Sequence, residues 1–172
     1  MKTEISYATS QDARAIAEIH VASWRAAYRD LLPEPYLAAL DVAELEARFR
    51  QVAEDRTCDV LLARRDGALQ GWLHCGSARD PDVPTTEGEI MAIYVAPAAW
   101  SSGVGQSLWL RAKDILIQRG YMTCILWVLA QNERAIRFYR SAGFAQTPPT
   151  PRHFELGGMR CEEVRYSRPI DR

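Results

Sequence analysis

Apolar residues recur along the chain with two different periods, and each period predicts a type of element. Between residues 13 and 29 the apolar and aromatic positions return every three or four residues, which is typical of a helix with one buried face. Residues 124–129 form an unbroken apolar run, which favours a strand covered on both faces. The same patterns predict strands at 5–9, 58–65, 68–77, 89–95, 154–156 and 159–168, a helical turn at 35–40, and helices at 42–52, from about 105, and at 132–142.

Turn and capping residues separate these segments. Asp66-Gly67 lies between two strand-like runs and predicts a tight hairpin. Gly120 and Gly143 follow two of the predicted helices, at positions where a glycine with positive φ commonly ends a helix. The resulting order is β, α, α, β, β, β, α, β, α, β, β, which indicates an α/β fold with antiparallel strands first and a β-α-β crossover in the middle. We expect one domain over residues 1–172.

Composition and charge exclude several classes of protein. The 172 residues include 21 Lys or Arg and 22 Asp or Glu, a formal net charge of 21 − 22 = −1, which argues against bulk binding to nucleic acid or to an anionic membrane. The four cysteines form no C-x-x-C pair, and the three histidines, His20, His74 and His153, lack ligand spacing, so no metal site is expected. Without a signal-like start or a long apolar span, we expect a cytoplasmic protein.

The segment from Glu89 to Leu108 runs from a strand through a turn of small residues into a helix. Such a turn leaves backbone N–H groups unpaired at the positive end of the helix dipole, which favours an anion and most of all a phosphate. A tight turn that binds nothing is the alternative. Neither the P-loop pattern nor the dinucleotide-binding glycine pattern fits, because no Lys follows and position 108 is Leu. The candidate amide donors are Ser101, Ser102, Gly103, Val104, Gly105, Gln106 and Ser107.

Two motifs in this half of the chain resemble the GNAT acyltransferase superfamily. The turn W-S-S-G-V-G at 100–105, after a strand ending in Y-V-x-P, is similar to that family's pyrophosphate motif Q/R-x-x-G-x-G/A. The stretch N-E-R-A-I-R-F-Y-R-S-A-G-F at 132–144 resembles the family's N-x-x-A-x-x-x-Y-x-x-x-G-F helix. Trp100 departs from the pattern, because the family usually has Gln or Arg there, and we expect altered but not lost phosphate contacts.

The resemblance implies a fold and a cofactor site. The fold would be a GNAT-like mixed, mostly antiparallel twisted sheet of about seven strands, flanked by about four helices. A V-shaped cofactor cleft would separate strands four and five, here 89–95 and 124–129. Acetyl-CoA would lie there as acyl donor, its pantetheine arm on the backbone of Ile93, Tyr94 and Val95 and its pyrophosphate on Ser101 to Ser107. The Val95 N–H would stabilise the thioester oxygen.

The resemblance also implies the catalytic residues. Tyr139 would protonate the leaving thiolate, and Asn132 and Ala135 share its helical face and would contact the cofactor. Glu89 would be the general base, directly or through water, with Glu87 as the competing carboxylate.

Several residues have simpler interpretations. Trp24 and Tyr28 would either wall the acceptor pocket or pack in the core. Cys75 and Cys124 are interpreted as small buried residues.

The sequence therefore predicts an acetyl-CoA-dependent N-acetyltransferase that transfers the acetyl group directly to an amine of a small molecule, peptide or protein. The alternatives are an acyl-CoA-binding sensor without activity and an O-acyltransferase. The acceptor is not identified, although the acidic residues Asp80, Asp82, Glu87 and Glu89 hint at a cationic amine. A homodimer through a sheet edge or the terminal hairpin is left open.

Overall fold

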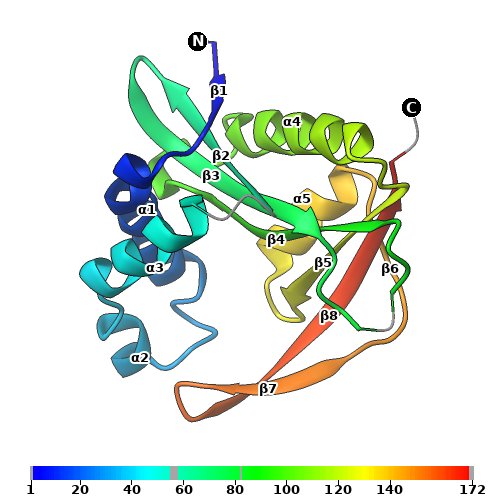
Figure 1. Ribbon diagram of the computed structural model, residues 1–172. Coiled ribbons are helices and arrows are strands. Elements are labelled where there is room, and N and C mark those ends of the chain that lie inside the picture. The colour runs from blue at the N-terminus through cyan, green and yellow to red at the C-terminus, as the bar shows by residue number, and fades with distance from the viewer. Residues whose placement is uncertain (1, 55–57, 82, 171–172) are drawn as a thin grey trace.

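A mixed β-sheet with helices on both faces forms the body of the computed structural model (Figure 1). The structure describes residues 2–54, 58–81 and 83–170. Over these residues the strands are β1 (Glu4–Tyr7), β2 (Cys58–Arg65), β3 (Ala68–Ser77), β4 (Glu87–Val95), β5 (Thr123–Leu129), β6 (Ala145–Gln146), β7 (Arg152–Leu156) and β8 (Met159–Pro169). The helices are α1 (Ala13–Ala27), α2 (Glu34–Ala38), α3 (Val42–Glu54), α4 (Val104–Gln118) and α5 (Glu133–Ser141).

The strands follow the order β1-β2-β3-β4-β5-β8-β6, and β7 pairs with β8 beside this path. The pairs in the sheet are antiparallel except for β4 and β5, which run parallel. The predicted mixed, mostly antiparallel sheet is therefore confirmed.

The element boundaries differ from the prediction at a few places. The short strand β6 brings the described sheet to eight strands, where about seven were expected. The helical turn expected at 35–40 is the helix α2. Strand β4 begins at Glu87 rather than Glu89, because Glu87 and Gly88 already pair with β5. The predicted caps Gly120 and Gly143 do have positive φ, +88° and +86°.

Each face of the sheet buries its own helices. One core cluster packs α4 and α5, through residues such as Leu108, Trp109 and Tyr139, against the central strands. The second packs α1 and α3, through Ile16 and Phe49, against the opposite face. The apolar stripes read from the sequence thus become the contact faces of these helices.

Strands β4 and β5 pair over a short length and then separate. The parallel ladder joins Glu87–Ile90 to Thr123–Leu126 and includes no later residue of β4. On the other side of β4, the register against β3 shifts between His74 and Cys75, so that Met91 is an extra residue opposite them. Such a bulge bends and twists its strand. The bulge therefore turns the end of β4 away from β5 and opens the V-shaped gap expected between them.

The end of this gap nearest the β7–β8 hairpin is closed by a third apolar cluster. Trp24, Tyr28 and the α2 residue Tyr36 pack there with Phe154 and Leu156 of β7. The hairpin tip lies close to α2, since a Cβ on Gly157 would lie 2.7 Å from the Tyr36 Cβ.

The structure also bears on the expectations about membranes and cysteines. Among the described helices none is long and apolar enough to span a bilayer. None of the cysteines Cys58, Cys75, Cys124 and Cys161 forms a disulfide within the described part of the chain.

A partly buried histidine of α1, His20, makes stability depend on pH. His20 stacks on Trp24 at 5.1 Å and meets Tyr94 at 4.8 Å, ring centre to ring centre. Burial, with a smaller contribution from the Arg48 charge, lowers the pKa of His20 from 6.5 to about 4. The folded protein therefore keeps the ring neutral while the unfolded chain takes up a proton, so stability falls as the pH drops from 6.5 to about 4.

We expect His20 to cost as much as about 3 kcal/mol of unfolding free energy at the acid end of this range. Urea unfolding across the range measures it, and His20→Gln should flatten the dependence while the exposed His153→Gln should not. Equal pH slopes in the wild type and His20→Gln would contradict this assignment.

Candidate active site

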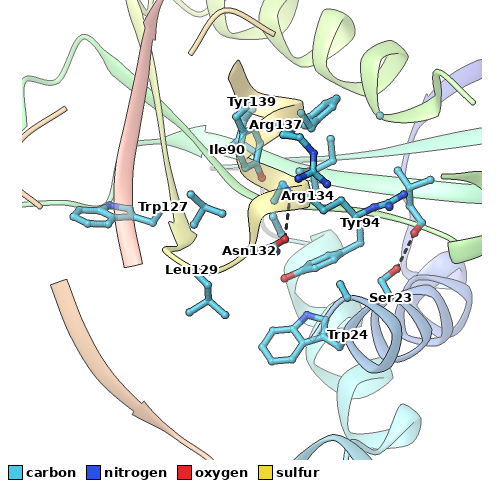
Figure 2. A pocket seen from close by; sticks show the side chains of 18 of the residues that line it. Ser23, Trp24, Ile90, Tyr94, Trp127, Leu129, Asn132, Arg134, Arg137 and Tyr139 are labelled. Atoms are coloured by element: carbon cyan, nitrogen blue, oxygen red, sulfur yellow. Dashed lines mark hydrogen bonds between the residues drawn. The ribbon is translucent and has the colours of Figure 1, made fainter. Parts of the chain in front are cut away.

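A cleft of about 740 Å³ occupies the gap between β4 and β5 (Figure 2). Tyr139, Arg134 and Arg137 project from α5 on one side, and Trp24 and Ser23 lie on α1 on the other. The structure brings most of the residues predicted from the sequence to this one cleft. Those lining it are Glu89, Ile93, Tyr94, Val95, Ser101, Gly103, Val104, Gly105, Gln106, Asn132, Ala135 and Tyr139; Ser102 and Ser107 are outside the lining.

The backbone of β4 presents alternate residues to the gap. The Ala96 amide donates to the Gln70 carbonyl on the β3 side, at 2.8 Å. By the alternation of an antiparallel pair, Tyr94 also directs its backbone groups to β3, whereas Ile93 and Val95 direct theirs away from it. Ile93 and Val95 therefore offer backbone hydrogen bonds to the cleft. Tyr94, expected to do the same, contributes its side chain instead.

The carbonyl of Val95 is already engaged. Ser23 Oγ donates to this oxygen at 2.9 Å and Trp100 Nε1 at 2.8 Å, so both of its lone pairs are used. Sequence reasoning missed Ser23, which lies 72 residues away from its partner in the chain. Since the carbonyl is held from two sides, the Val95 N–H is the polar group of this residue that is left to a ligand.

Residues 101–106, here called the amide loop, connect β4 to the first turn of α4. Ser101 and Gly103 have φ of 59° and 87°, which turns the chain sharply into the helix. The Ser107 amide donates to the Gly103 carbonyl at 3.0 Å, but within the described part of the chain no protein acceptor is found for the amides of the loop. Arg65 Nη2 holds the Ser102 carbonyl at 2.7 Å. Unpaired N–H groups at a helix N-terminus form an anion site.

The two glycines of the loop have different roles. Gly103 has positive φ, and a Cβ on it would meet nothing within 4 Å, so the space above it is open. A Cβ on Gly105 would lie 3.3 Å from the Phe138 ring. Gly105 therefore permits the close approach of α4 and α5, while Gly103 leaves room for a ligand.

Helix α5 presents Tyr139 to the cleft. The Asn132 side chain caps this helix by accepting from the Ala135 amide at 3.1 Å, as predicted. Tyr139 is 8% exposed. Burial raises its pKa, with further contributions from the Tyr28 hydroxyl and the Cys124 thiol. The hydroxyl therefore carries its proton at neutral pH and is able to donate it.

Aromatic residues of α1 face Tyr139 across the cleft. Trp24 and Tyr28 pack edge to face at 4.9 Å, line the cleft and pack against the third apolar cluster, while a contact with the acceptor stays a prediction. Burial raises the pKa of the Tyr28 hydroxyl, and the neighbouring Tyr94 and Asn132 side chains oppose this shift to a smaller extent. A group of protonated hydroxyls thus surrounds the middle of the cleft.

Glu89 lies at the other end of the cleft, where a single arginine holds it. The residue is 1% exposed, and its Oε2 accepts from the Arg79 backbone N–H at 3.0 Å and from Arg79 Nε at 3.1 Å. Arg79 Nη2 donates to the second oxygen at 2.6 Å. Glu87, the competing carboxylate, is not among the residues that line the cleft. Arg79 was missed because nothing in its local sequence signals this contact.

The other acidic residues near this end are paired as well. Asp80 accepts from Trp127 Nε1 at 3.0 Å and from Arg152 at 3.3 Å, and Arg152 also pairs with Glu163. Asp82 lies outside the described residues. Of the four acidic residues from which a cationic acceptor was expected, Asp80 and Glu89 are therefore paired with arginines.

Two other groups of reactive side chains were considered from the sequence. Over the described residues no cluster of His, Cys, Asp or Glu could hold a metal ion. Burial raises the pKa of the Cys75 thiol to about 12 and raises that of Cys124 as well. Both thiols are therefore protonated and packed in the core, which agrees with their interpretation as small buried residues.

The comparisons with known proteins agree with this geometry. The sequence model of the Acetyltransferase (GNAT) family matches residues 14–144. An uncharacterized N-acetyltransferase, YuaI of Bacillus subtilis, is 29% identical over 156 residues, covering 90% of this chain and 86% of that protein. A mycothiol acetyltransferase of Cellulomonas flavigena is 38% identical over 118 residues, covering 66% of this chain and 34% of that protein.

Solved structures share the fold. The PaiA N-acetyltransferase of Thermoplasma acidophilum, crystallised with coenzyme A, superposes with a TM-score of 0.77 at 20% identity, covering 98% of this chain and 99% of that one. The fold and the cleft are those of an acyltransferase. The chain belongs to the acetyltransferase (GNAT) family.

Removing the Arg79 side chain should destabilise the protein, because the buried Glu89 carboxylate loses two of its three hydrogen bonds and keeps only the one from the backbone N–H of residue 79. The side chain of Arg79 is 61% exposed, so water replaces part of the loss. We expect Arg79→Leu to cost about 1–3 kcal/mol of unfolding free energy.

Urea unfolding measures this cost against Arg137→Leu, which removes an exposed pair with Glu133 and should cost less than about 0.5 kcal/mol. Equal losses in the two variants would show that the Glu89 pair is no more than a surface contact.

Proposed function

We propose that the protein is an acetyl-CoA-dependent N-acetyltransferase that moves the acetyl group from the thioester directly to an amine. The observation that supports this most is one continuous cleft that joins the unpaired amides of the amide loop, the free backbone of β4 and the protonated Tyr139. We take residues 1–172 as one acyltransferase domain. We also propose a cytoplasmic location, which suits cysteines that form no disulfide among the described residues.

The residues present suit coenzyme A in particular. Six consecutive amides and the dipole of α4 would hold the pyrophosphate, and the space above Gly103 is open to it. The N–H group of Ile93 would bind an amide group of the pantetheine arm, since β4 lacks a neighbouring strand there. The thioester would then lie between β4 and Tyr139.

The chain supplies two groups for the acyl transfer. The Val95 N–H would donate to the thioester carbonyl oxygen as it gains negative charge, and one such aimed donor contributes ~3–4 kcal/mol. Tyr139 would give its proton to the departing sulfur as the new C–N bond forms and the C–S bond breaks. The raised pKa of Tyr139 keeps that proton available at neutral pH.

The amine must lose a proton, and Glu89 is the group we propose to receive it through water. An alkylammonium with a pKa near 10.4 requires ~4–5 kcal/mol to lose a proton at pH 7. A carboxylate has about four lone-pair sites, and Arg79 occupies three on Glu89. One site on Oε1 is left for a bridging water molecule.

Acetyl transfer is tested by following thiol release from acetyl-CoA in the presence of a panel of amines that includes polyamines, amino acids and peptides. We expect release that depends on one class of amine, with acetyl-amine as product. Saturable CoA binding without turnover on any amine would instead indicate a sensor. Transfer to hydroxyls alone would indicate an O-acyltransferase, and absence of CoA binding would overturn the proposal.

Replacing the proposed acid separates chemistry from binding. Tyr139→Phe should lower kcat by about 100-fold or more with little change in KM, because the leaving sulfur loses its proton donor while the cleft keeps its shape. Tyr121→Phe, which removes a hydroxyl outside the cleft, is the matched control. A kcat for Tyr139→Phe within about twofold of the wild type would exclude the acid role.

Two glycines on α4 test the phosphate site. Gly103 and Gly120 have φ of +87° and +88° at opposite ends of the helix, and a Cβ on either would meet nothing within 4 Å. Alanine at each should cost a similar ~1–2 kcal/mol of stability through backbone strain. Only Gly103→Ala should also weaken CoA binding, by about tenfold, when measured by calorimetry. Equal CoA affinities in the two variants would remove the phosphate role of the amide loop.

A further inference from the structure

Trp100 connects the end of β4 to α5. It precedes the amide loop and departs from the Gln or Arg of the family motif. Its indole Nε1 donates to the Val95 carbonyl at 2.8 Å, which fixes the ring beside the cleft. The guanidinium carbon of Arg134 lies 3.8 Å from the centre of that ring. The stack therefore joins two segments that are 34 residues apart in the sequence (134 − 100 = 34).

Arg134 has an uncompensated positive charge. Among the residues that the structure describes it has no ion-pair partner, whereas Arg137, one turn further along α5, pairs with Glu133 at 3.3 Å. Arg134 is exposed and lines the cleft (Figure 2). Stacking on Trp100 restricts its side chain, so less rotational freedom remains to be lost when it binds an anion.

The stack lies beside the amide loop. Trp100 precedes the loop directly, and one helical turn beyond Arg134 the Phe138 ring approaches the Gly105 position to 3.3 Å, measured to a Cβ built there. The face of α5 that carries these residues thus follows the loop. A guanidinium stacked on an aromatic ring keeps its N–H groups in the plane of the fork, directed outward, where they match two oxygens of a phosphate.

We propose that Trp100 positions Arg134 to bind a phosphate group of coenzyme A, so that this pair supplies the contact for which the family motif has Gln or Arg at position 100. The proposal rests on the proposed function above. Arg134 is the binding residue, and Trp100 acts through it. The 3′-phosphate and the pyrophosphate have the same chemistry, and dephospho-CoA, which lacks the 3′-phosphate, distinguishes them.

Calorimetric titration with CoA and with dephospho-CoA, at low and at physiological salt, tests the proposal. We expect Arg134→Gln to weaken CoA binding by about tenfold and to reduce its salt dependence. Arg140→Gln, an exposed arginine of the same helix outside the cleft, should change neither. A loss confined to CoA assigns Arg134 to the 3′-phosphate, and an equal loss with dephospho-CoA assigns it to the pyrophosphate.

The role of Trp100 is tested by combining variants. Trp100→Leu should weaken CoA binding, and Trp100→Leu with Arg134→Gln should bind no more than about twofold more weakly than Arg134→Gln alone. Trp100→Phe keeps an aromatic ring under Arg134 and should retain most of the affinity. Additive losses would show that Trp100 acts independently of Arg134.

Two results would overturn the proposal. If Arg134→Gln binds CoA as tightly as the wild type, with the same salt dependence, this proposal fails while the acetyltransferase activity stands. If the wild type itself binds no CoA, the proposed function fails and this proposal with it.

Discussion

The site depends on one extra residue in β4. Met91 has no separate partner on β3, and the parallel ladder to β5 ends at the preceding residue, Ile90. Beyond this point β4 has a neighbour on one side only, and backbone groups on its other side need other partners. The Val95 carbonyl finds Ser23 and Trp100, while the N–H groups of Ile93 and Val95 face the cleft. The same bulge that opens the gap thus provides the donors that line it.

The nearly neutral charge of the chain fits a site of this kind. Phosphates held by backbone amides and a helix dipole need few cations, and the cleft keeps most of its arginines in ion pairs. Arg79 and Arg152 pair with acidic residues at the far end of the cleft, whereas Arg134, beside the amide loop, has no ion-pair partner among the described residues. The net charge of −1 therefore says little about the ligand, because the charges are arranged in local pairs.

Features set by neighbouring residues were predictable from the sequence, and features set by distant contacts were not. Asn132 and Tyr139 lie on one face of the α5 segment because of their helical spacing. The small residues after Val95 predict the turn from local sequence, whichever strands pair with β4. The bulge at Met91 depends on how β3 pairs with β4, which no local pattern records. Arg79 and Ser23 reach the site from a loop and from another helix, so only the folded chain reveals them.

Amide hydrogen exchange followed by NMR, with and without coenzyme A, tests the central claim most directly. We expect coenzyme A to slow exchange at Ile93, Val95 and residues 101–106, whose amides lack acceptors among the described residues. Exchange at Tyr94, whose amide is directed to β3, should change little. Protection that appears elsewhere, while Ile93, Val95 and the amide loop exchange at their former rates, would show that coenzyme A does not bind along β4 and the loop.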